Sequence, residues 1–249
     1  YLKDISQSAY SAFQKLGPTN SLLKVLEMLP PSEHLTSLIN LLLKPSLKNP
    51  QLRALIELWL PEASPPPKAA LTQLLLKHSE VLPLAGACMP ELKPFSASVR
   101  RGLKEEDCYD TQLEALNNSH TAKEYPQAQV YAVGHFLLKE DIGLKVAATS
   151  ALKSLGVQFP EYTHKILGVV IKNASQEEQI RAIMQVWNEI PSGIQHLASQ
   201  DPDLSVLLNL AHLQVHRRQR AFTSVKESQV QPEFIKELIV PLMNFYILF

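Results

Sequence analysis

The feature that most constrains the fold is a nonapeptide that occurs twice, as QLRALIELW from Gln51 to Trp59 and as QIRAIMQVW from Gln179 to Trp187. Both copies place aliphatic residues, an Arg–Ala pair and a closing Trp in the same order. The similarity extends upstream, because LINLLLK aligns with ILGVVIK at the same offset. Adjoining segments that recur together indicate a repeated structural unit.

Two more segments, LTQLLLK and VGHFLLK, also close on a lysine after aliphatic residues. The closing lysines Lys44 and Lys77 are 33 residues apart, as are Lys139 and Lys172, and 62 residues separate the middle two. The longer interval has room for two shorter units. A near-constant period of this length is typical of stacked helical hairpins, in which each hairpin buries its apolar face against the next.

Each unit is predicted to be a pair of amphipathic helices, here called helix A and helix B. The chain contains 18 prolines and 8 glycines, and most prolines fall between periodic segments, where proline begins or ends a helix. No segment alternates as a strand does, so the sequence predicts an all-α fold. The predicted apolar stripes of helix B are Leu52, Leu55, Ile56 and Trp59 in one copy and Ile180, Ile183, Met184 and Trp187 in the other. A compact bundle of leucine-rich helices is the alternative.

Other details of the units follow from short motifs. Ser175 and Glu178 have the spacing of a capping box at the start of a helix B. A third helix B is predicted over 143–156, where Ala147, Ala148 and Ala151 would let a neighbouring helix approach closely. Residues 1–30 are predicted to form one more hairpin. Residues 202–228 and 232–249 are each predicted to form a helix.

The segments LRALIEL and IRAIMQV resemble the helix-B signature of the HEAT-repeat family, which is armadillo-like, over about 30–60 and 128–190. The resemblance implies a right-handed α-solenoid of about six to seven stacked helical hairpins. That family favours an Asp in the inter-helix turn, six residues before the signature Arg. Here Leu47 precedes Arg53 and Ser175 precedes Arg181, while the third unit has Asp141 but Ala147 at the Arg position. We expect residues 1–249 to form a single solenoid segment, a fragment of a longer array.

Periodicity is weakest in the middle of the chain. Residues 104–127 are polar and include an acidic run, so we expect an irregular or mobile loop there. Such a loop is either a partner-binding element or a solvated spacer.

Composition limits the partners and the compartment. Lys plus Arg and Asp plus Glu number 24 each, so no net charge draws the chain toward nucleic acid or anionic membrane, although a local basic patch remains open. No apolar run reaches the ~18–20 residues that a membrane span needs. The two cysteines, Cys88 and Cys108, are too few for a disulfide framework. We therefore expect an intracellular protein, cytoplasmic rather than nuclear.

The sequence contains no phosphate-binding glycine loop, nucleophile elbow or zinc-protease motif. His212 and His216 stand four residues apart on a predicted helix, but no third ligand is near them in sequence. We therefore expect a non-catalytic protein with no catalytic residues, cofactor or metal. An all-α enzyme whose site is assembled from distant residues is the alternative.

The absence of a catalytic motif and the presence of repeats favour a scaffold that binds other proteins, as part of a larger complex and in contact with adjoining repeats of the same chain. Its candidate partner-binding residues are Arg53, Glu57, Arg181, Gln185, Arg217, Arg218 and Arg220. The alternative function is a nucleic-acid-binding helical repeat that uses the basic cluster over 212–226.

Overall fold

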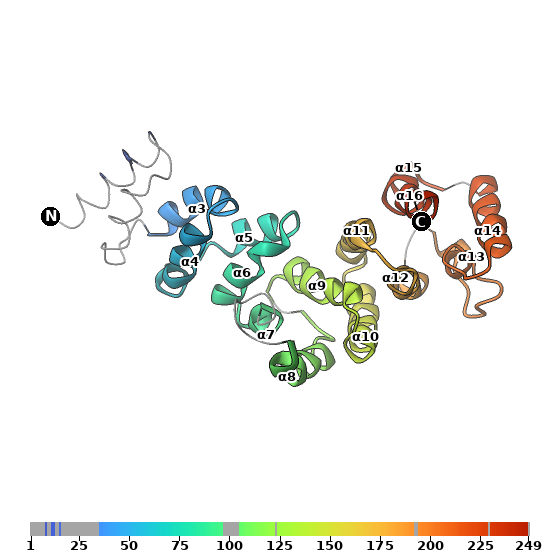
Figure 1. The fold of residues 1–249 in the computed structure, drawn as a ribbon, viewed down its shortest axis with the longest axis horizontal. Helices are drawn as coiled ribbons and strands as arrows, with labels where there is room; N and C mark the ends of the chain where they lie inside the picture. The colour runs from blue at the N-terminus through green and yellow to red at the C-terminus, as the bar shows by residue number, and fades with distance from the viewer. Residues whose placement is uncertain are drawn as a thin grey trace. The chain divides into compact units, whose positions relative to one another are not determined.

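The computed structural model describes residues 35–96, 105–122, 124–191, 194–228 and 230–248, together with Ser8, Ser11, Ala12 and Lys15. Over these residues every regular element is a helix, which confirms the all-α prediction. The hairpin predicted over 1–30 lies almost entirely outside the described residues. Backbone contacts divide the chain into two compact units, Tyr1–Cys108 (unit 1) and Tyr109–Phe249 (unit 2), and each is described here by itself (Figure 1).

Unit 1 consists of short helices that fold back on one another (Figure 1). They are α3 (Leu35–Ser46), α4 (Pro50–Trp59), the 3-10 helix η1 (Leu60–Glu62), α5 (Lys68–Leu75), η2 (Ser79–Val81), α6 (Leu82–Cys88), η3 (Pro90–Leu92) and α7 (Lys93–Ser96). Helix α3 packs on α4, α5 packs on α6, and α4 packs on α6. Helices α3 and α5 correspond to two predicted A helices: α3 contains Lys44, and α5 ends two residues before Lys77. Helix α4 is the predicted helix B.

The α3–α4 turn is held by polar side chains. The Asn49 side chain accepts hydrogen bonds from the amides of Gln51 and Leu52, each at 3.1 Å, and so caps α4 at its N-terminus. Pro50 takes the first helical position, where its missing amide hydrogen costs nothing. The stripe predicted from the nonapeptide is buried in full. Helix α4 therefore forms where and as the sequence predicts.

Unit 2 contains the longer helices. They are most of α8 (Glu105–Asn117), α9 (Pro126–His135), η5 (Phe136–Leu138), α10 (Ile142–Gln158), α11 (Pro160–Val170), η6 (Ile171–Asn173), α12 (Glu177–Glu189), η7 (Gln195–Leu197), α13 (Val206–Asn209), α14 (Val215–Glu227), α15 (Pro232–Phe234), the π-helical η8 (Ile235–Ile239) and α16 (Val240–Leu248). Two hairpins, α9–α10 and α11–α12, lie against each other, since α9 packs on α11 and α10 packs on α12. Each helix of one hairpin thus packs on its counterpart in the other.

Small residues bring these helices close together. Ala147, Ala148 and Ala151 are buried on α10, as predicted. A Cβ added to Gly134 of α9 would lie 2.9 Å from Cγ2 of Ile166 on α11, and one added to Gly156 would lie 2.5 Å from Cγ1 of Ile190. Because real Cβ atoms do not approach other carbons so closely, these glycines set the spacing between the helices.

Helix α8 corrects the prediction of an irregular or mobile loop over 104–127. Residues 105–117 are helical. Only a narrow line of side chains along α8, including Gln112 and Leu116, is buried, so the polar residues around it concealed the helical period. The turn after α8 is held as well, because Gln129 donates to Thr121 O at 3.1 Å and Gln158 donates to His120 O at 2.6 Å.

The predicted capping box is also wrong by one residue. Its acceptor is not Glu178 but Gln179, whose Oε1 accepts from the amides of Ser175 at 2.8 Å and Gln176 at 3.2 Å. Its Nε2 donates to the carbonyl of Leu138 at 2.6 Å, which joins α12 to the turn between α9 and α10 in the preceding hairpin. In the third unit Asp141 accepts from the amide of Leu144 at 2.8 Å and so caps α10.

The helix predicted over 202–228 is two helices, α13 and α14, with a break over 210–214. Side chains bind the backbone at this break: Nδ1 of His212 accepts from the amide of Gln214 at 3.0 Å, and Arg218 donates to the carbonyls of His212 and Leu213. Further on, Pro241 has no amide hydrogen to donate four residues back, which explains why the preceding turn is π-helical.

The right-handed solenoid of six to seven hairpins and the single segment over 1–249 stay predictions.

Candidate functional site

Of the residues predicted to bind a partner, Arg53 has a structural role in unit 1. Its Nη2 donates to the carbonyl of Leu47 at 2.8 Å and of Ser46 at 3.3 Å, and its Nε donates to Ser46 at 3.4 Å. These carbonyls lie at the C-terminal end of α3, where no intrahelical donor remains. Arg53 thus binds the inter-helix turn directly, without the Asp that the HEAT-repeat resemblance implies.

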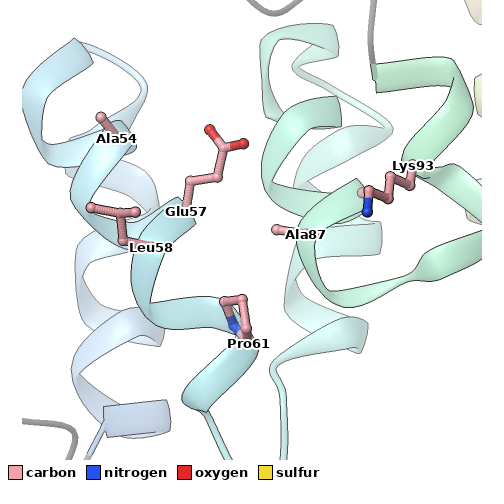
Figure 2. Close-up of a pocket in the computed structure, with 7 residues that line it drawn as sticks. Ala54, Glu57, Leu58, Pro61, Ala87 and Lys93 are labelled. Atoms are coloured by element: carbon pink, nitrogen blue, oxygen red, sulfur yellow. The ribbon is translucent and has the colours of Figure 1, made fainter.

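Glu57 faces a groove between α4 and α6, called the α4–α6 groove (Figure 2). The groove has a volume of about 540 Å³ and is lined by Ala54, Glu57, Leu58, Pro61, Gly86, Ala87 and Lys93. Figure 2 shows Glu57 extending from α4 toward the helix that carries Ala87, with Lys93 on that opposite side. Leu58 is 74% exposed. The predicted helix-B surface therefore does line a groove in unit 1, with an apolar side chain open to solvent beside a carboxylate.

On the second copy of the nonapeptide, Arg181 is held within its own helix. Its guanidinium lies 3.6 Å from a carboxylate oxygen of Glu177 and 4.0 Å from one of Glu178, so these charges attract without hydrogen bonds, and its buried Nη1 has no hydrogen-bond partner among the described residues. Gln185 is exposed on the same helix. Neither residue lines the α4–α6 groove, so the two copies of the nonapeptide have different surroundings.

The basic cluster over 212–226 does not form one cationic surface. Arg217 pairs with Asp203, and this hydrogen bond followed by the attraction of the charges lowers the pKa of the Asp203 carboxyl. Arg218 turns toward α16, where its Cζ lies 4.4 Å from the centre of the Tyr246 ring. Arg220 is exposed. The three arginines thus point in different directions around α14, and only Arg218 lines a groove.

That groove, called the α14–α16 groove, is the larger of the two, with a volume of about 870 Å³. Helix α14 supplies one wall, and η8 with α16 supplies the other. Its lining residues are Val215, Arg218, Gln219, Phe222, Thr223, Val225, Lys226, Ser228, Ile235, Ile239, Met243, Tyr246 and Ile247. Val215 is 56% exposed, Met243 46% and Ile247 74%. Apolar side chains at this exposure, gathered along one groove, mark a surface suited to binding.

Sequence reasoning missed most of this groove. Val215, Phe222 and Lys226 share a helical face by their spacing, but only Lys226 of the three belongs to the basic cluster predicted over 212–226. On α16, Met243, Tyr246 and Ile247 form part of the other wall. The hydroxyl of Tyr246 is buried without a hydrogen-bond partner, and burial raises the pKa of this phenol to about 12.

Few metal-binding or reactive groups occur among the described residues outside these grooves. No group of three or more His, Cys, Asp and Glu side chains among the described residues could hold a metal ion. Cys88 and Cys108 are unpaired, and burial raises the pKa of the Cys88 thiol to about 11, which suppresses the reactive thiolate. Among the helices of the described part of the chain, none combines the length and the hydropathy that crossing a membrane requires.

Comparison of the chain with known protein families, with curated proteins and with solved structures finds no match in any of the three.

Proposed function

We propose that this chain is a non-catalytic scaffold that binds other proteins, built as a HEAT-like right-handed solenoid of stacked hairpins. The observation that carries the proposal is the α14–α16 groove, whose apolar walls are open to solvent along the length of a helix. The smaller α4–α6 groove repeats the combination of an exposed apolar side chain with charged neighbours.

The exposure of the walls favours a protein over a small molecule as the ligand. A pocket for a small apolar ligand encloses most of the ligand's surface. Here Val215, Met243 and Ile247 remain about half or more exposed, so only a ligand as long as the groove would remove their surface from water. Protein interfaces have this composition, with an apolar centre and a polar rim.

The scaffold proposal also assigns different tasks to the predicted residues. Glu57 and Arg218 belong to the binding surfaces because they line the grooves. Arg53 and Arg181 contribute to folding, since their guanidinium groups bind a helix end and adjacent carboxylates.

The test is capture of proteins by the full chain, followed by quantitative mass spectrometry. Leu58→Glu and Ile247→Glu each place a charge in one groove at a side chain that is 74% exposed, so neither should disturb folding. The matched control is Gln185→Glu, at an exposed position that lines neither groove.

We expect each groove variant to lose a set of proteins that the control retains. If both variants capture the same proteins as the wild type, in the same amounts, the grooves are not the binding surface and the proposal is wrong.

A further inference from the structure

The α14–α16 groove has a cationic rim along one wall. Its charged lining residues are Arg218 and Lys226, and no carboxylate lines it. Glu237, on the opposite wall element, faces elsewhere: a Cβ added to Gly168 of α11 would lie 3.2 Å from Cβ of Glu237. The groove therefore presents positive charge beside its apolar floor, although the whole chain has no net charge.

Arg218 keeps its charge available because its partners are neutral. Its Nη1 donates to the carbonyls of His212 at 2.7 Å and Leu213 at 2.9 Å, and its Cζ stacks 4.4 Å from the centre of the Tyr246 ring. These contacts fix the guanidinium in position without supplying a countercharge. A group held in this way loses little conformational freedom when a carboxylate binds it.

The length of the groove matches a short helix. The residues of α14 that line it run from Val215 to Lys226, which is about three turns or ~17 Å of helix. Along this length Val215, Phe222 and Val225 contribute apolar surface, faced by Ile239, Met243 and Ile247. An amphipathic helix binds such a groove through apolar residues at positions i, i+3 or i+4, and i+7.

We propose that the α14–α16 groove binds an acidic amphipathic helix of a partner protein, with its apolar face on the groove floor and its carboxylates beside Arg218 and Lys226. The proposal rests on the scaffold function and specifies the chemistry of one partner. A basic helix would place like charges against the rim. A nucleic-acid strand would pair with the rim but leave the apolar walls in water.

The test uses a fluorescent amphipathic peptide of about 14 residues, long enough for ~21 Å of helix. Leucine occupies its i, i+3, i+4 and i+7 positions and glutamate its remaining positions, and a second peptide carries lysine in place of every glutamate. Fluorescence anisotropy measures the binding of each peptide to the full chain at low and high salt.

Two pairs of variants test the two parts of the groove. Ile247→Glu alters the apolar wall, and its matched control is Ile142→Glu, at an isoleucine of α10 that is 72% exposed and does not line the groove. Lys226→Glu alters the rim, and its matched control is Arg220→Glu on another face of α14. Circular dichroism melting shows that each variant is folded before it is titrated.

We expect the glutamate peptide to bind and the lysine peptide to bind at least about tenfold more weakly, with salt weakening only the glutamate peptide. Lys226→Glu should weaken the glutamate peptide about fivefold and Ile247→Glu by about tenfold or more, while both controls bind as the wild type does. Equal binding of the two peptides, or binding unaffected by Lys226→Glu and Ile247→Glu, would overturn the proposal. So would a concentration-dependent dimer that Ile247→Glu dissociates, because the groove would then be occupied by a second copy of the chain.

The outcome also separates this inference from the scaffold function. If the glutamate peptide fails to bind while Ile247→Glu still loses captured proteins, the groove binds proteins of another chemistry, and only the acidic-helix proposal is wrong. If Leu58→Glu and Ile247→Glu both leave capture unchanged and neither peptide binds, both proposals are wrong.

Discussion

Gln179 should stabilise unit 2 far more than its exposed counterparts do, because its side chain joins two hairpins. The residue is 4% exposed, and its side-chain amide forms hydrogen bonds with three backbone groups, the amides of Ser175 and Gln176 and the carbonyl of Leu138. Gln179→Leu preserves the side-chain volume but leaves all three backbone groups without this partner.

The expected loss follows from those three bonds. A typical intramolecular hydrogen bond contributes about 1 kcal/mol net, so removing three would cost about 3 kcal/mol. Water reaches the exposed residues Ser175 and Gln176 and replaces part of their bonding, which lowers the expectation to about 2 kcal/mol. Gln179→Glu should cost as much or more, because a carboxylate oxygen would then face the carbonyl of Leu138.

The assay is urea unfolding followed by tryptophan fluorescence. The chain contains two tryptophans, so a Trp59→Phe background leaves Trp187, which is 1% exposed, as the reporter for unit 2. The matched control is Gln185→Leu, at an exposed site on the same helix. It should change the free energy of unfolding by less than about 0.5 kcal/mol. A loss in Gln179→Leu no larger than in Gln185→Leu would refute the bridging role.

Three further predictions follow from the described contacts. Arg53→Ala should destabilise unit 1 by about 1–2 kcal/mol, because the carbonyls at the end of α3 lose their donor. The control variant Arg220→Ala should have nearly the stability of the wild type. Equal urea midpoints for these two variants would contradict the role of Arg53 at the helix end. Gly156→Ala should lower the melting temperature although alanine favours a helix, because its Cβ would lie 2.5 Å from Ile190. Ile190→Ala should cost less stability in the Gly156→Ala chain than in the wild type, because the clash is then relieved; an unchanged melting temperature in Gly156→Ala would contradict the close contact. Arg217→Ala should raise the pKa of the Asp203 carboxyl toward 3.8, as measured by NMR titration, because Arg217 lowers that pKa. The Arg217–Asp203 pair stabilises the fold above the pKa of Asp203 in the unfolded chain, and this stabilisation is lost as the pH falls through the pKa of Asp203 in the folded chain. An unchanged pKa of Asp203 in the variant would contradict the pairing.

Apolar periodicity predicted helix position and burial well. The stripe of Leu52, Leu55, Ile56 and Trp59 and that of Ile180, Ile183, Met184 and Trp187 are buried in full. Such a stripe depends on spacing along one helix, and any neighbour that removes water satisfies it. The predicted A helices were recoverable for the same reason, and Ala147, Ala148 and Ala151 of the third predicted helix B are buried.

Polar segments and polar roles were predicted poorly. Helix α8 buries so few side chains that its composition resembles a loop. Helical spacing alone separates Arg217, Arg218 and Arg220, because successive residues on a helix point about 100° apart, but it does not say which of them a neighbouring helix will meet. The α14–α16 groove needs α16 beside α14, and no local pattern states which helices become neighbours.

The sequence by itself determined that this chain folds as short helices and which face of each helix is buried, because proline positions and apolar spacing act within one helix. Only the tertiary structure decided what the polar residues of the repeated nonapeptide do. Gln51 is exposed while Gln179 binds Leu138, and Arg53 binds the end of α3 while Arg181 pairs with Glu177. A hydrogen bond requires a partner within about 3 Å, and that partner is supplied by whichever backbone group or side chain the fold places nearby.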